Sequence, residues 1–167
     1  QEVRDLLTKQ GFKVVMTRKR DTFPDLTERA QIANRARADL LVSLHFNAFI
    51  PDKSVNGAET YCLTPVGASS SNAGGAGVRS RSYPGNANNR DNINLAFQLQ
   101  KSLVNSAGSD DRGVKRARFE VLREATMPAA LVETAFMSNA AEGKKVFDTK
   151  SRKAFAQAIA NGIVAYK

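Results

Sequence analysis

The hydrophobic and polar positions of the chain follow two periods, one typical of helices and one typical of strands. Helical spacing predicts five helices: residues 3–10, 25 or 27 to 37, 91–106, 138 or 139 to 147, and 151–166. Short apolar runs predict five strands: residues 12–17, 40–45, 57–63, 119–122 and 128–134. Because helices and strands alternate, the pattern predicts an α/β fold with a mostly parallel, twisted sheet and helices on both faces.

The 167 residues fit one domain that is large enough to bury a hydrophobic core, and we find no internal repeat. Residues 65–89 consist largely of Gly, Ser, Ala and Asn and predict an irregular segment, either a lid over a site or a solvated surface loop. The glycines at 74, 75 and 77 do not lead from a strand into a helix, which argues against a nucleotide-phosphate loop. No apolar run approaches the roughly 20 residues of a membrane span, and none resembles a secretory signal.

The net charge of +9, from 25 Lys and Arg against 16 Asp and Glu, favours an anionic partner such as nucleic acid, acidic lipid or an anionic wall polymer. The basic residues are dispersed, with the densest cluster at 112–118, and no aromatic ladder is interleaved with them. Nucleic-acid binding is therefore allowed by charge and supported by no motif. The single cysteine, Cys62, excludes an internal disulfide and a Cys-rich zinc cluster.

Two buried-looking strands end in ionisable residues, which are His45, the only histidine, and Glu133. In open α/β sheets, ligands bind beyond the carboxyl ends of the strands. An imidazole and a carboxylate at neighbouring strand ends suit a metal site or a general acid/base pair. The alternatives are an ordinary histidine at a strand end, and a salt bridge from Glu133 to an arginine such as Arg123.

No nucleophile competes with this pair. The chain has no G-x-S-x-G elbow. Ser43 lies two residues before His45, so strand alternation allows the two side chains to touch, but no third member of a triad is evident. Cys62 lacks the electropositive surroundings that would favour a thiolate.

The segments ADLLVSLHFNA (38–48) and PAALVETAFMSNAAE (128–142) closely resemble two signatures of the zinc-dependent N-acetylmuramoyl-L-alanine amidases, the amidase_3 family. Residues 14–39 and 112–128 add supporting matches. The resemblance runs through nearly the whole chain in the right order. It identifies residues 1–167 as a catalytic domain of this family.

The resemblance implies an enzyme that cleaves the amide bond between N-acetylmuramic acid and the first L-alanine of the peptidoglycan stem, outside the cytoplasm. It implies that His45 is a zinc ligand and that Glu133 is the general base acting on zinc-bound water. Ser43 and Asn47, which flank His45, become candidate contacts to the ligands or the substrate. The basic surplus fits the approach to an anionic cell wall.

This chain departs from the family's pattern in one respect. The family's first zinc-binding histidine lies in a Gly-His-Gly-Gly turn after the first strand, and its glutamate ligand opens the first helix; neither has a counterpart here. Glu2 lies too far along the predicted first helix to replace that glutamate. We therefore expect an N-terminally incomplete domain with half of a metal site, and a sheet that lacks a central strand and exposes an apolar edge.

Two other hypotheses remain open. One is a metal-free wall-binding or regulatory pseudo-enzyme of the same fold, and the other is a basic nucleic-acid-binding domain. The missing ligands favour the pseudo-enzyme, whereas the presence of both His45 and Glu133 favours the amidase.

Overall fold

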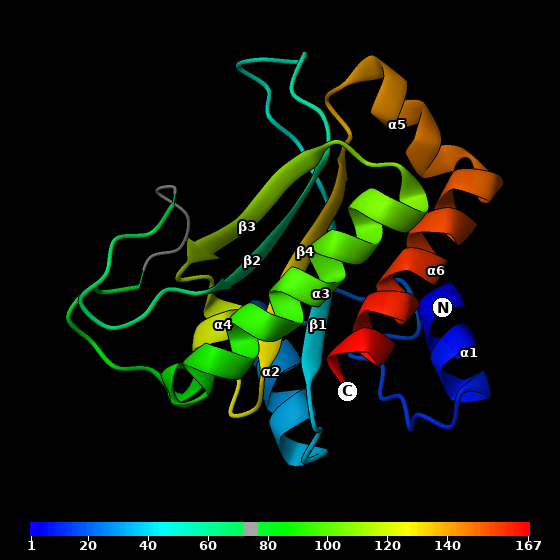
Figure 1. The fold of residues 1–167 in the computed structure, drawn as a ribbon. Coiled ribbons are helices and arrows are strands. Elements are labelled where there is room, and N and C mark those ends of the chain that lie inside the picture. Colours follow the sequence, from blue (N-terminus) through cyan, green and yellow to red (C-terminus); the bar gives the residue numbers. More distant parts are fainter. Residues whose placement is uncertain (72–76) are drawn as a thin grey trace.

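The computed structural model describes residues 1–71 and 77–167 and contains one four-stranded sheet with the strand order β1-β4-β2-β3 (Figure 1). The strands are β1 (Leu41–Asn47), β2 (Ala58–Leu63), β3 (Asp111–Ala117) and β4 (Ala129–Phe136). β1 runs parallel to β4 and β2 runs parallel to β3, whereas β2 and β4 are antiparallel. Two of the three pairings are therefore parallel, which confirms the predicted α/β class.

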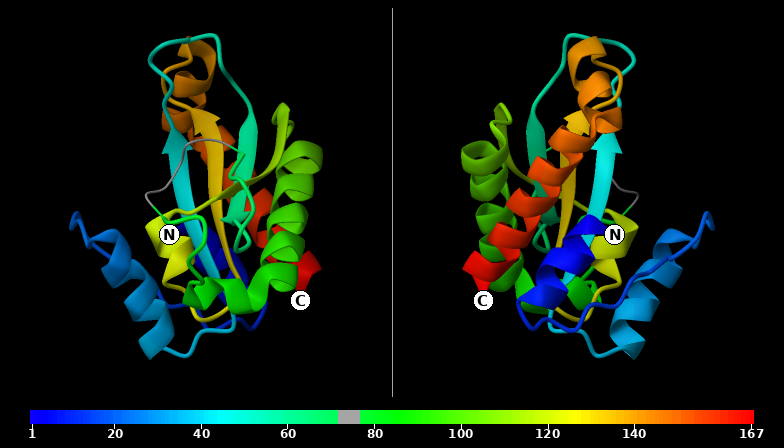
Figure 2. Two further views of the ribbon diagram at one scale, coloured as in Figure 1. Left: turned by 90° about the vertical axis from the view of Figure 1, so that its left-hand side faces the viewer. Right: turned by 90° about the vertical axis from the view of Figure 1, so that its right-hand side faces the viewer.

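Helices cover both faces of this sheet (Figures 1 and 2). Their bounds are α1 (Glu2–Lys9), α2 (Leu26–Arg35), the 3-10 helix η1 (Pro84–Asn88), α3 (Asn89–Ala107), α4 (Glu120–Arg123), α5 (Ala140–Phe147) and α6 (Thr149–Tyr166). α3 and α6 pack on one face, and α1 packs against α6. α4 contacts β2 and β4 on the other face, with α2 beside it.

The central strand β4 is apolar on both sides because each side contributes to a separate core. Ala130 and Val132 belong to the core beneath α3 and α6. Ala129 and Leu131 belong to the core beneath α2 and α4. Alternation places Glu133 on the same side as Leu131, one step further toward the end of the strand.

The predicted strand at residues 12–17 is not formed. This segment and β1 line a groove of about 600 Å³, and β1 is an edge strand of the sheet. A β-strand is stabilised by hydrogen bonds to a neighbouring strand, and the groove separates residues 12–17 from the nearest strand. β-branched composition alone therefore does not produce a strand here.

The predicted strand at residues 119–122 is also wrong. The strand lies earlier, at Asp111–Ala117, and Glu120–Arg123 forms α4. Val121 and Leu122 are buried in the core beneath α2 and α4, so the apolar run reflects helix packing. The charged residues of 112–118 obscured β3, because an edge strand tolerates charged side chains.

Glu142 ties α5 to the ends of two strands. Asn139 caps the helix by accepting hydrogen bonds from the N–H groups of Ala141 and Glu142. The carboxylate of Glu142, 5% exposed, instead accepts the N–H of Gly57 at 3.1 Å and the N–H of Phe136 at 2.8 Å. This residue therefore joins the start of β2 to the end of β4.

We expect Glu142→Ala to lower the free energy of unfolding by about 2–4 kcal/mol, because it leaves two buried N–H groups without acceptors. Glu142→Gln keeps one carbonyl acceptor and should lose about half as much. Urea unfolding of both variants measures the difference. Equal stability of Glu142→Ala and the wild type would contradict a structural role for these two hydrogen bonds.

Candidate active site

His45, Glu133 and Glu59 lie opposite one another on three adjacent strands. His45 of β1 is the register partner of Glu133 of β4, and Glu133 is in turn the partner of Glu59 of β2. Register partners in a sheet point to the same side. Because β2 is antiparallel to β4, the row joins the carboxyl ends of β1 and β4 to the amino end of β2, near α5 (Figure 2).

His45 is partly buried and contacts Ser43. Its Nε2 lies 2.8 Å from the Ser43 hydroxyl oxygen, so the two side chains do share one face of β1. Burial lowers the pKa of His45, and the positive charges of Arg29 and Arg18 lower it further. The imidazole is therefore neutral at neutral pH and has a lone pair to offer to a metal ion or a proton.

Glu133 is a partly buried carboxyl group with a raised pKa. Burial, followed by the negative charge of Glu59, raises the pKa of Glu133 to about 7. Its Oε2 is buried and has no hydrogen-bond partner among the described residues. The expected alternative, an ion pair with Arg123, does not occur, since Arg123 pairs with Glu120 at 4.0 Å. A carboxyl group with a pKa near 7 and an unpartnered oxygen is typical of a catalytic site.

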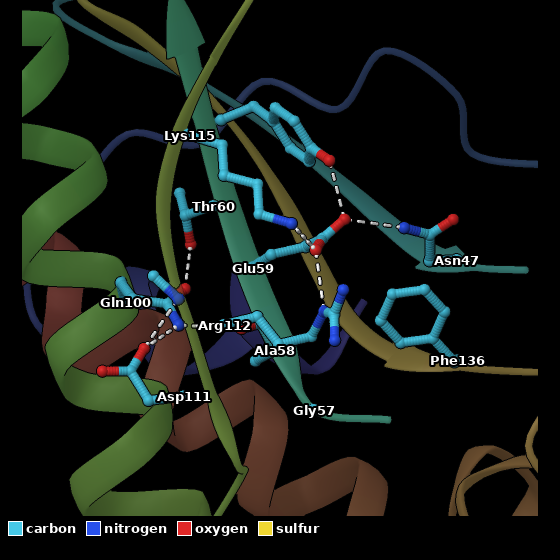
Figure 3. A network of polar contacts seen from close by, with 12 residues as sticks. Asn47, Gly57, Ala58, Glu59, Thr60, Gln100, Asp111, Arg112, Lys115 and Phe136 are labelled. Carbon is cyan, nitrogen blue, oxygen red and sulfur yellow. Dashed lines mark hydrogen bonds and ion pairs between the residues drawn. The ribbon is translucent and has the colours of Figure 1, made fainter. Parts of the chain in front are cut away.

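A cluster around Glu59 completes the row (Figure 3). Glu59 is 3% exposed, and its Oε2 accepts hydrogen bonds from Arg112 Nε at 2.9 Å and Lys115 Nζ at 2.5 Å. Its Oε1 accepts from the Tyr61 hydroxyl at 2.7 Å and from Asn47 Nδ2 at 3.0 Å. Burial alone would raise the pKa of Glu59, but the hydrogen bonds from Lys115, Tyr61 and Arg112 hold it below its ordinary value.

Sequence reasoning missed Glu59, Arg112 and Lys115. Alternation in residues 57–63 does place Glu59 and Tyr61 on one face, but nothing local shows that this face continues the row of His45 and Glu133. Asn47, a candidate contact from the sequence, bonds to Glu59 and not to His45. It therefore links the end of β1 to the cluster.

The described residues alone do not form a complete zinc site. Among residues 1–71 and 77–167, no three His, Cys, Asp or Glu side chains come together to hold a metal ion. Within the row, His45 presents an imidazole, Glu133 has an unpartnered oxygen beside it, and Glu59 is bound by two cations. Cys62 lies in the core beneath α3 and α6, on the opposite face, and burial raises the pKa of its thiol.

The segment 65–89 is only partly described. The residues at 74 and 75, which belong to the glycine run rejected as a phosphate loop, lie outside the described residues. On one side of the gap, Arg118 donates hydrogen bonds to the carbonyls of Pro65 and Ala68. On the other side, the Tyr83 hydroxyl accepts the N–H of Val78. Whether the segment acts as a lid stays a prediction.

In the part of the chain that the structure describes, no helix has both the length and the apolar character needed to cross a membrane. This finding concerns α3 and α6, which are the two longest helices.

Comparison with known proteins gives a consistent result. The family model for N-acetylmuramoyl-L-alanine amidase, Amidase_3, matches residues 1–165. The amidase LytC of Bacillus subtilis (strain 168) is 38% identical over 160 residues, covering 96% of this chain and 28% of LytC. The amidase AmiA of Salmonella typhimurium is 31% identical over 186 residues, covering 98% of this chain and 64% of AmiA. The chain thus spans less than two thirds of either relative.

Solved structures show the same likeness. The catalytic domain of the amidase CwlV, from Bacillus (Paenibacillus) polymyxa var. colistinus, superposes with a TM-score of 0.78 at 31% identity. The match covers 99% of this chain and 78% of that domain. The amidase AmiC2 of Nostoc punctiforme gives a TM-score of 0.80 at 28% identity, with the same coverage of both chains.

Proposed function

This chain belongs to the amidase_3 family of N-acetylmuramoyl-L-alanine amidases, and we propose that it hydrolyses the amide bond between N-acetylmuramic acid and the first L-alanine of the peptidoglycan stem. Residues 1–167 act as the catalytic domain. The observation that carries the proposal is the buried, unpartnered oxygen of Glu133 directly across the sheet from His45. The substrate class is supported by family membership, and the hydrolytic chemistry is supported by the pair of Glu133 and His45.

Glu133 acts as the general base. Its carboxylate takes a proton from the water that attacks the carbonyl carbon, and it returns a proton to the leaving amine. A pKa of about 7 suits both transfers, since the group is ionised in part and reprotonated readily at neutral pH. Ser43 fixes the orientation of the His45 ring, and Asn47 holds Glu59 beside Glu133.

Zinc is the cofactor that the family implies, and when bound it would activate the attacking water. In the row, Glu133 is proposed as the base and Glu59 is bound by two cations, which leaves His45 as the ligand, so the described residues do not by themselves fit a three-ligand centre. We therefore propose His45 as one ligand and derive no catalytic step through the metal.

Peptidoglycan is the proposed partner, and the site of action is extracytoplasmic, in the periplasm, in the cell wall or after secretion. The net charge of +9 supports the approach to an anionic wall polymer. We expect no specific binding of nucleic acid, because neither a motif nor an aromatic ladder accompanies the basic residues.

A second candidate function is a wall-binding or regulatory protein that has the amidase fold and binds no metal. The incomplete set of metal ligands in the described residues favours it. It predicts binding to peptidoglycan without release of peptide.

The test measures bound zinc and the release of stem peptide from purified peptidoglycan. It compares this chain with a version extended at its N-terminus by a segment that carries the family's Gly-His-Gly-Gly turn and glutamate ligand. We expect the extended protein to bind zinc and release peptide, and His45→Ala to lower its zinc content at least about tenfold. Zinc binding without peptide release would refute the amidase proposal and favour the pseudo-enzyme.

A further inference from the structure

The cluster around Glu59 contains more positive charge than its carboxylate can neutralise. Arg112 and Lys115 both bind the same oxygen, Glu59 Oε2, so the three side chains keep a net charge of one positive unit. Glu59 is 3% exposed, whereas the side chains of Arg112 and Lys115 are 34% and 25% exposed. The carboxylate is thus the buried anchor, and the cations remain accessible to an anion from solvent.

Arg112 retains two free donor groups. It uses Nε for Glu59, and its guanidinium lies 5.0 Å from the centre of the Phe136 ring. Its two Nη atoms donate no hydrogen bond to any residue that the structure describes. Because Glu59 and Phe136 hold the group from two sides (Figure 3), its orientation is fixed before an anion arrives. A planar guanidinium with free N–H groups is well suited to bind a carboxylate through two hydrogen bonds.

The distance to the reacting bond can be read from the strand order. Arg112 and Lys115 lie on β3, and Glu133 lies on β4 with β2 between them. Two strand spacings correspond to about 10 Å. An extended peptide advances by about 3.3–3.6 Å per residue, so a carboxylate two or three residues beyond the reacting amide would reach these cations.

We propose that Arg112 and Lys115, held by Glu59, form a binding site for a carboxylate of the stem peptide and thereby select acidic stem peptides. This inference rests on the proposed function, because it assumes that the amide of the stem is placed at Glu133. The alternative is that both cations only neutralise Glu59. These two explanations differ in whether the charge of the ligand matters.

The test is a binding measurement that requires no turnover. The probe is a soluble muramoyl peptide released from purified peptidoglycan by a muramidase, used as the free acid and after chemical amidation of its carboxyl groups. Isothermal titration in the presence of a metal chelator gives the dissociation constants. We expect the wild type to bind the free acid about tenfold more tightly than the amidated form, as loss of a charge-assisted hydrogen bond predicts.

Variants locate the effect. Arg112→Gln and Lys115→Met should each bind the free acid several-fold more weakly and leave binding of the amidated form unchanged. Arg112→Lys should retain part of the preference. Lys101→Gln, on the exposed surface of α3, removes the same charge away from the site and should change neither constant. Thermal unfolding checks that every variant is folded. If Arg112→Gln does not fold, the comparison rests on Lys115→Met.

The outcomes separate the two proposals. Equal binding of both probe forms by the wild type, or a preference that survives in Arg112→Gln and Lys115→Met, overturns the carboxylate site and leaves the amidase proposal intact. Binding of neither form contradicts the proposed substrate class itself.

Discussion

Glu133→Gln is expected to reduce peptide release from peptidoglycan by about 10²–10⁴-fold, the usual contribution of a general base. Glutamine has nearly the shape of glutamate and cannot accept the proton of the attacking water at neutral pH. We expect turnover to fall and substrate binding to stay unchanged, because Glu133 pairs with His45 across β4 and β1 at the proposed reaction site. The measurement is the initial rate of stem-peptide release by the active form of the protein.

Two controls make this result specific. Bound zinc should stay unchanged in Glu133→Gln, because His45 and not Glu133 is the proposed ligand. Glu124→Gln, at the C-cap of α4, removes the same charge outside the row and should retain full activity. Unchanged turnover in Glu133→Gln would exclude Glu133 from the role of base.

The same substitution should stabilise the protein above neutral pH. The pKa of Glu133 is raised from 4.5 to about 7 in the folded protein. Between these values the folded chain keeps a proton that the unfolded chain has released, so this group's contribution to stability is complete below pH 4.5 and declines as the pH rises to about 7. Glutamine carries no charge at any pH and avoids this loss. Because Glu133 is only partly buried, we expect a gain of about 1–3 kcal/mol at about pH 8.

Urea unfolding of both proteins at about pH 5 and about pH 8 measures this difference. The advantage of Glu133→Gln should be larger at the higher pH. Glu59→Gln provides an independent check, because removing its negative charge should lower the pKa of Glu133 and shift the decline in stability to lower pH. If the free energies of unfolding of Glu133→Gln and the wild type differ by the same amount at both pH values, ionisation of Glu133 does not destabilise the folded protein. A residue that destabilises the native state in its active charge form is typical of catalytic sites.

Much of the fold follows from local patterns in the sequence. The apolar runs at residues 40–45 and 128–134 predict β1 and β4. The reason holds for β4, which is buried on both faces and needs apolar side chains at nearly every position. β1 is an edge strand with Leu44 and Phe46 exposed, so its predicted burial is wrong. The long helices α3 and α6 follow from their apolar stripes. The prediction was wrong where one pattern fits two structures. The apolar run at 119–122 fits a strand or a buried helical turn equally well, and it forms α4.

The segment at residues 12–17 shows what a local pattern cannot decide. Its β-branched residues permit a strand, but a strand also requires a partner at hydrogen-bond distance, and β1 lies across a groove from it. Pairing depends on which segments meet in space.

The sequence by itself determined that His45 and Glu133 lie toward the carboxyl ends of two strands, because an ionisable residue after an apolar run is visible in the order of residues. The strands themselves continue to Asn47 and Phe136. Only the tertiary structure decided that Glu59 lies beside Glu133, since the antiparallel pairing of β2 with β4 brings the start of one strand to the end of the other. It also decided that Arg112 and Lys115 meet on one carboxylate oxygen. These contacts join residues more than 50 positions apart, and only the folding of the sheet brings them together.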